Sequence, residues 1–261
     1  GGTNIMMRSL YTAASGMMAQ QMNMDNISNN LANVQSTGFK KTRVDFQDLL
    51  YATMQDPGTE ATAGTQIGMG VRASSTERMF SQGSLQKTSN PYDVAIQGDG
   101  FFKVTMPDGT SAYTRDGAFK YDGDKGEIVT SAGQSLGIAV PKDVTNIEVR
   151  PNGEVFGVRI DGDGQPEKIA QVKLTRFLNP AGLQAIGGNL YVETPVAGAK
   201  TESIPGEDGL GVLAQGHLEK SNINVVEEMI SIVQAQRAFE MNQKGVQAAD
   251  EMMRMTNQLQ S

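Results

Sequence analysis

The 261-residue sequence contains no cysteine and a single histidine, His217. Without cysteine the chain cannot form disulfides or bind zinc or iron–sulfur clusters through thiolates, and one histidine has no partner for a histidine-based metal site. A Ser-His-acid catalytic set would have to be built around His217, which the sequence pattern places beside the linker to the last helix. We therefore expect no catalytic residues, no metal and no cofactor, and we do not expect an enzyme.

A basic face and long apolar runs are also missing. The formal net charge is −7, and the longest basic cluster, residues 40–43, fits cations that complement a helix dipole. A nucleic-acid partner is therefore not expected. No uncharged apolar run approaches the roughly 18 residues of a membrane span. The start at residues 6–13 lacks the apolar core of a cleavable secretory signal, and residues 1–5 are expected to be an added remnant.

Two aspartate–glycine runs resemble the start of a calcium loop, but neither fits one. In residues 161–165 the following Pro166 occupies the position that needs glycine, and Val172 occupies the position that needs a bidentate glutamate. The run at residues 122–126 fails in the same way. The segment Gly98-Asp99-Gly100 lacks a third glycine opening a helix, so it is not a dinucleotide fingerprint. We interpret all three as turns.

What the sequence does contain is an apolar seven-residue spacing near each end. Such spacing keeps apolar side chains on one stripe of a helix, which a partner helix can cover. It predicts one helix over residues 9–34, ending near Gly38, and another over residues 221–260, capped by Ser221 or Asn222. Since neither stripe can be buried by its own helix, we expect the two ends to pair. The predicted assembly interface consists of Leu10, Met17, Met24, Ile27, Leu31, Val34, Val225, Ile232, Phe239, Val246 and Met253.

The first predicted helix carries almost no charge. Asp25 is its only formal charge from Ser9 to Val34, and asparagine and glutamine fill most of the other polar positions. A solvated helix normally shows paired lysine and glutamate instead, so this helix is expected to have neighbours on several faces. Eleven of the 15 methionines lie in the two terminal segments, which suits packing that differs slightly from copy to copy. Burial inside one domain and simple core filling are the alternatives.

The middle of the chain has a different pattern. Aspartate–glycine and asparagine–glycine pairs, which favour tight turns, separate short strand-like runs. The expected strands are 93–96, 101–104, 127–129, 147–149, 155–158 and 172–174. We predict an α+β fold, in which a coiled-coil domain of the two terminal helices (6–37 and 218–261) carries a mainly antiparallel β domain (71–217). Residues 38–70 are the expected linker, with an amphipathic stretch at 46–54 and an extended, glycine-rich arm at 56–70.

Several segments together resemble the bacterial flagellar rod and hook proteins. They are SLYTAASGMMAQQMNMDNISNNLANVQSTGFKK (9–41), SNPYDVAIQGDGFF (89–102), YTRDGAF (113–119), GEIVTSAG (126–133) and SNINVVEEMISIVQAQRAFEMNQKGVQAADEMM (221–253). The resemblance covers nearly the whole chain from Met7. The opening, the arm and the last helix resemble distal rod members more than hook or proximal rod members.

This resemblance implies a structural subunit of the distal rod, which polymerises through its terminal helices into a hollow, rigid shaft that transmits torque from motor to hook. The implied partners are further copies in a helical tube, the proximal rod proteins, the hook protein, the surrounding envelope rings and the flagellar type III export apparatus. The implied location is the basal-body rod, from periplasm to outer membrane, reached without a cleaved signal peptide. The arm is a candidate bridge to an adjacent subunit.

Three alternatives stay open. A hook-type subunit would bend, and it would usually lack the arm and carry a larger outer domain. A secreted protein could use the terminal helices only as a coiled-coil dimer stalk. A monomer with a coiled-coil hairpin would keep both helices ordered in dilute solution, whereas an assembly subunit is expected to leave them partly unfolded until partners cover the stripes.

Overall fold

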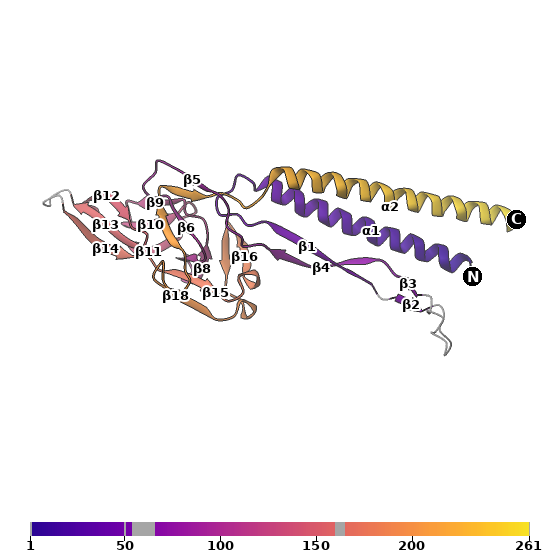
Figure 1. Ribbon diagram of the computed structural model, residues 1–261, viewed down its shortest axis with the longest axis horizontal. Coiled ribbons are helices and arrows are strands. Elements are labelled where there is room, and N and C mark those ends of the chain that lie inside the picture. The colour runs from indigo at the N-terminus through magenta and orange to yellow at the C-terminus, as the bar shows by residue number, and fades with distance from the viewer. Residues whose placement is uncertain (1, 50, 54–65, 160–164, 261) are drawn as a thin grey trace. The chain divides into compact units, whose positions relative to one another are not determined.

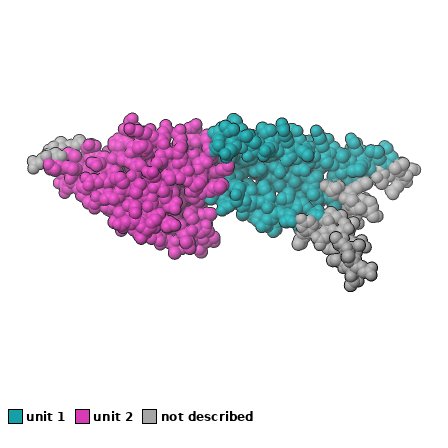
Figure 2. All heavy atoms as spheres, viewed as in Figure 1, with its two compact units in different colours: residues 1–32, 42–78, 224–261 teal, residues 33–41, 79–223 magenta. Residues whose placement is uncertain are grey.

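A computed structural model describes residues 2–49, 51–53, 66–159 and 165–260. The chain forms two compact units (Figures 1 and 2). Unit 1 contains residues 1–32, 42–78 and 224–261, and unit 2 contains residues 33–41 and 79–223. Residues 42–78, which we expected to be divided between the linker and the β domain, therefore group with the terminal helices.

Unit 1 is built on two long helices, α1 (Gly2–Ala32) and α2 (Val225–Gln260), which pack against each other as predicted (Figure 1). Helix α1 ends at Ala32, before the expected stop at 36–38, and Gly38 instead adopts a positive φ of 65° in a later turn. Helix α2 begins later than expected. Its cap is Asn224, whose Oδ1 accepts the Val226 N–H at 3.1 Å, rather than Ser221 or Asn222.

A two-stranded hairpin completes unit 1. Strand β1 (Thr42–Asp48) pairs antiparallel with β4 (Val71–Arg78), and β2 (Tyr51–Thr53) pairs with β3 (Gln66–Gly68). Residues 46–48 and 51–53 of the stretch predicted to be an amphipathic helix are therefore strand, because pairing within the hairpin decides their structure. Most of the predicted arm, residues 56–65, lies outside the described residues.

Unit 2 is the antiparallel β module that the turn pattern predicts. Its largest sheet has the strand order β16-β17-β8-β7-β11-β10-β9, with β15 on β7 and β18 on β15. A three-stranded sheet, β12-β13-β14, and two pairs, β19-β6 and β20-β5, complete it. Short 3₁₀ turns lie at Pro180–Gly182 and Pro195–Ala197. The strands are β5 Leu85–Lys87, β6 Val94–Gln97, β7 Phe101–Thr105, β8 Ser111–Thr114, β9 Phe119–Asp122, β10 Glu127–Thr130, β11 Ser135–Ala139, β12 Val144–Val149, β13 Glu154–Arg159, β14 Pro166–Gln171, β15 Leu174–Phe177, β16 Gln184–Gly187, β17 Leu190–Val192, β18 Lys200–Ser203, β19 Val212–Gln215 and β20 His217–Glu219.

Five of the six strands expected in this region are present within three residues of their predicted ends. The sixth, 172–174, is displaced, because β14 ends at Gln171 and β15 starts at Leu174. Strands β5, β8, β9, β11, β14 and β16 to β20 were not predicted, since their runs are short and several are exposed on both faces. Of the predicted aspartate–glycine and asparagine–glycine turn pairs, those ending at Gly100, Gly109 and Gly153 use a positive φ, and those ending at Gly117 and Gly123 do not. The pairs at residues 161–164 lie outside the described residues.

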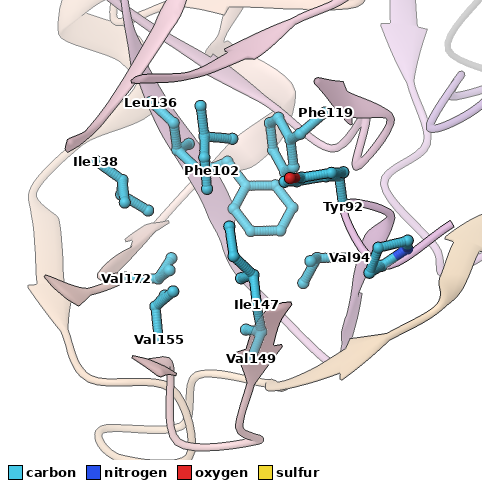
Figure 3. A pocket seen from close by; sticks show the side chains of 12 residues that line it. Tyr92, Val94, Phe102, Phe119, Leu136, Ile138, Ile147, Val149, Val155 and Val172 are labelled. Atoms are coloured by element: carbon cyan, nitrogen blue, oxygen red, sulfur yellow. The ribbon is translucent and has the colours of Figure 1, made fainter. Parts of the chain in front are cut away.

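The core of unit 2 is apolar and closely packed. Phe102 is 1% exposed and meets Phe119 edge to face, with ring centroids 5.0 Å apart. Figure 3 shows side chains from several strands converging here around a void of about 20 Å³, lined by residues such as Val94, Ile138 and Val155. A void of this size has room for about one water molecule, and its lining is almost entirely apolar. It is therefore part of the core and not a ligand site.

Candidate assembly surface on the terminal helices

The two long helices are antiparallel and contact each other at points well separated along their lengths. Asn30 Nδ2 on α1 donates to Glu228 Oε2 on α2 at 3.5 Å, and Gly16 faces Asn242 further along the pair. Fourteen residues separate these contact points on each helix, in opposite chain directions. A Cβ atom at Gly16 would lie only 2.9 Å from Asn242 Nδ2, so the absence of a side chain there allows the helices to approach closely.

On α2, the predicted interface residues other than Val225 lie on the same side of the helix as Glu228 and Asn242, which contact α1. Ile27 is 5% exposed, and Val34 lies just beyond the end of α1. Val225, at the start of α2, is 37% exposed. The remaining ones are partly buried: Leu10, Met17, Met24, Leu31, Ile232, Phe239, Val246 and Met253. The sequence analysis missed several deeply buried residues of the two helices, the small side chains of Ala19, Ala235 and Ala249 and the polar pair Asn30 and Glu228.

A second face of α1 holds the hairpin through its amides. Asn26 and Asn30 both donate to the Thr42 carbonyl, at 2.8 and 2.9 Å, and the Thr42 N–H donates back to Asn30 Oδ1 at 3.0 Å. Near the other end of the hairpin, the Val71 N–H donates to Ser15 Oγ at 3.4 Å. These contacts explain part of the asparagine content of α1, because an amide can satisfy both a backbone donor and a backbone acceptor where a charged side chain could not.

The outward face of α2 carries an apolar stripe that the seven-residue pattern did not reveal. Met241 is 71% exposed, Val226 64% and Ile230 53%. The stripe repeats every 11 residues and its members are Val226, Ile230, Val233, Arg237, Met241, Lys244, Ala248, Met252 and Met255. An 11-residue repeat corresponds to about 3.67 residues per turn, so these positions stay on one side of the helix. At 100° per residue, this side is opposite the inner face.

Helix α1 also presents an outward stripe, formed by Tyr11, Met18 and Met22, which are 59%, 71% and 52% exposed. Their spacing of seven and four residues places them on one face, together with the exposed Asp25. Isolated exposed apolar residues are ordinary, but contiguous stripes on a surface usually mark an interaction site. The α2 stripe carries two cations, Arg237 and Lys244, and the α1 stripe one carboxylate, so the two outward stripes are complementary in charge.

Nothing in these faces provides catalytic or metal chemistry. Within the described part of the chain, no three His, Cys, Asp or Glu side chains lie close enough to hold a metal ion. His217 contacts the Gln215 carbonyl through Nδ1 at 2.9 Å and lies in unit 2. Among the described helices, none is both long and apolar enough to cross a bilayer. The arrangement defines a class of protein in which two terminal helices have exposed apolar outward faces and the segment between them forms a β module.

Comparison with known proteins names the class. Three family models match the chain: "Flagella basal body rod protein" at residues 10–40, "Flagellar hook protein FlgE/F/G D1 domain" at 95–157, and "Flagellar basal body rod FlgEFG protein C-terminal" at 214–259. The two terminal matches contain most of α1 and α2, and the central one covers β7 to β12. The chain is thus a flagellar axial protein of the rod and hook type.

Similar proteins identify the family within this class. The chain is 47% identical to the flagellar basal-body rod protein FlgG of Borreliella burgdorferi, over 97% of this chain and 99% of that protein. It is 45% identical to the FlgG protein of Caulobacter vibrioides (98% and 100%) and 38% identical to that of Bacillus subtilis (95% and 97%). The hook protein FlgE of Helicobacter mustelae matches at 39%, over 59% of this chain and 35% of that protein. The chain belongs to the FlgG family of flagellar basal-body rod proteins, which are structural subunits and not enzymes.

Proposed function

We propose that copies of this chain polymerise through the outward stripes of α1 and α2 into a hollow, rigid tube, the distal rod. The observation that carries the proposal is the α2 stripe, a long row of exposed apolar side chains on a helix whose opposite face is already occupied by α1. In this proposal the predicted seven-residue stripes hold α1 and α2 together as a coiled coil within each copy, and the outward stripes meet neighbouring copies.

The two outward stripes differ, and this difference favours an open-ended assembly. A contact between the α1 stripe of one copy and the α2 stripe of the next joins two unlike surfaces. Such heterologous contacts repeat head to tail, so they generate open helical filaments, or rings where the rotation closes, rather than two-fold dimers. The charge complementarity of Asp25 with Arg237 and Lys244 would favour this pairing over contacts between like stripes.

The family supports the remaining parts of the proposal. As a distal rod, the tube would transmit torque from motor to hook and would meet the proximal rod proteins, the hook protein and the envelope rings. The rod would extend from the periplasm to the outer membrane. Its subunits would be exported by the flagellar type III apparatus without a cleaved signal peptide. The arm at 56–70 would bridge adjacent subunits and stiffen the shaft. In this proposal, residues 6–37 and 218–261 form the assembly domain.

Two isoleucines on opposite sides of α2 provide the decisive experiment. Ile230 is 53% exposed on the outward stripe, whereas Ile232, two residues later, is partly buried on the inner face. Ile230→Asp should raise the critical concentration for assembly by at least roughly a hundredfold, because about 2 kcal/mol of apolar burial is lost and a charge must be desolvated. Ile232→Asp should instead loosen the α1–α2 pair in the dissociated subunit.

Sedimentation and negative-stain microscopy measure assembly, and far-ultraviolet circular dichroism of dilute protein measures helix content. Gln247→Asp is the matched control, since it adds the same charge at an exposed position between the two stripes. We expect the control to assemble normally and Ile230→Asp to keep full helix content without assembling. Normal tubes from Ile230→Asp would refute the outward stripe as the assembly surface.

A further inference from the structure

Unit 2 contains a buried arginine whose charge is only partly balanced. Arg115, which follows β8, is 3% exposed, and its Nη1 lies 3.5 Å from Glu219 Oε2. Glu219 is itself 1% exposed and also pairs with Lys40 Nζ at the shorter distance of 2.6 Å. The Nε–H of Arg115 is buried and has no hydrogen-bond partner. A buried carboxylate therefore serves two buried cations, and the arginine is the less well satisfied of the two.

Arg115 lines a pocket of about 190 Å³ in the same unit. A second cation, the exposed Arg176, and the exposed carboxylate of Asp99 also line it. Phe80, Phe101 and Phe177 form much of the rest of the lining, and Phe80 and Phe101 meet edge to face with centroids 5.4 Å apart. The pocket thus combines guanidinium groups with aromatic walls.

The charges around the pocket do not cancel. Among the side chains that line the pocket, Arg115 and Arg176 contribute two positive charges and Asp99 one negative charge, and Glu219, which contacts Arg115, is already paired with Lys40. Burial lowers the pKa of Arg115, and the carboxylates of Glu219 and Asp99 oppose this effect. Arginine nevertheless stays protonated in proteins, so the excess charge persists. One further carboxylate would balance it, and guanidinium groups bind carboxylates with well-oriented, charge-assisted hydrogen bonds.

We propose that this pocket binds a carboxylate group carried on a compact apolar or aromatic body. The guanidinium groups of Arg115 and Arg176 supply the attraction, the phenylalanine rings cover the apolar part, and Asp99 opposes binding. The site lies wholly within unit 2 and does not depend on polymerisation through the terminal helices. The ligand could be a free small molecule, or an acidic side chain together with an adjoining apolar side chain of a second copy of this chain.

Benzoate is a suitable probe, and benzamide, which has nearly the same shape without the charge, is its control. Ligand-observed saturation-transfer NMR with dilute full-length protein detects weak binding. We expect saturation by benzoate and none by benzamide. Arg176→Gln should weaken benzoate binding roughly tenfold, and Asp99→Asn should strengthen it several-fold. Both residues are exposed, so neither change should prevent folding. Lys103→Gln, which removes an exposed cation paired with Glu202 elsewhere, should leave binding unchanged.

The same measurement on assembled protein distinguishes the two sources. A benzoate signal that disappears on assembly would show that an acidic side chain of a neighbouring copy fills the pocket, and an unchanged signal would point to a free carboxylate. The proposal is overturned if dilute protein gives no benzoate signal, if benzamide gives an equal one, or if the Arg176→Gln and Lys103→Gln variants lose affinity equally.

Discussion

The buried ion pair between Lys40 and Glu219 makes a quantitative prediction about the stability of unit 2. Lys40 Nζ donates to Glu219 Oε1 at 2.6 Å and to the Ser81 carbonyl at 2.8 Å, and the two charged side chains are 0% and 1% exposed. The pair joins the short segment 33–41 to β20, which lies 179 residues later in the chain. Lys40→Met keeps most of the side-chain volume and removes the charge.

The expected loss of stability follows from the contacts that Glu219 retains in this variant. Without Lys40, the Glu219 carboxylate retains the Gly83 N–H at 2.8 Å and the longer contact with Arg115 at 3.5 Å. Removing one partner of a buried pair typically costs about 3–5 kcal/mol, because the remaining charge stays buried. For a unit of this size, that loss lowers the melting temperature by roughly 6–20 °C.

The chain offers a matched control. Lys200 and Glu193 also lie 2.6 Å apart, but their side chains are 47% and 39% exposed. Because water screens this pair, Lys200→Met should cost no more than about 1 kcal/mol. The two variants remove the same residue type at the same distance, so the difference between their stabilities isolates the effect of burial.

Urea unfolding at low protein concentration provides the measurement. The chain has no tryptophan, so tyrosine near-ultraviolet circular dichroism is the natural signal, and four of the six tyrosines lie in unit 2. A double-mutant cycle with Glu219→Gln should show that the two changes together cost at least about 1 kcal/mol less than their sum. Additive losses, or equal losses for Lys40→Met and Lys200→Met, would refute the reasoning.

Two further predictions concern unit 2. Burial raises the pKa of Asp116, so the folded state holds this proton to higher pH than the unfolded state, and the ionised carboxylate costs stability above pH 3.8. The amide oxygen of Asp116→Asn can accept the same two hydrogen bonds. This variant should therefore be at least as stable as the original protein at neutral pH and should lose any advantage in acid. A loss of stability that does not depend on pH in urea titrations would contradict this. Gly117→Ala should destabilise by several kcal/mol, because its Cβ would lie 1.9 Å from the Val94 carbonyl oxygen, whereas Gly123→Ala meets nothing within 4 Å and should leave the melting temperature unchanged.

The helices were predictable because their signal is long and periodic. The seven-residue spacing correctly indicates that the ends of the chain pair, since it repeats over several turns of each helix. The boundaries were less accurate. The cap of α2 is Asn224 and not the earlier Ser221 or Asn222. Asparagine and serine have similar capping preferences, so the sequence alone could not select among these neighbouring candidates.

The hairpin was harder to predict for a physical reason. Strand β1 binds α1 through Thr42 and pairs with β4 across a bulge between Asp45 and Phe46. These are contacts between segments far apart in the sequence, and neither strand has a clean alternation of buried and exposed residues. Local patterning therefore cannot distinguish the stretch 46–54 from an amphipathic helix, and tertiary contacts decide the outcome.

The outward stripe of α2 was missed because a search for seven-residue spacing selects only one of two periods. Ile230, Met241 and Met252 are spaced 11 residues apart, whereas Ile232 and Phe239 are spaced seven apart, so a search for the seven-residue period does not find the first set. The signal was nevertheless present in the sequence. It becomes recognisable once the structure shows which face α1 already covers.

These two periods on one helix have a mechanical consequence. A straight α-helix has about 3.6 residues per turn, so the inner stripe, at about 3.5, favours a left-handed supercoil, and the outer stripe, at about 3.67, favours a right-handed one. If partners cover both stripes of α2, the two tendencies oppose each other. A helix held by α1 on one face and by a neighbouring copy on the other can then remain nearly straight. In the proposed tube this balance would oppose the left-handed supercoiling of α2 that seven-residue seams alone favour.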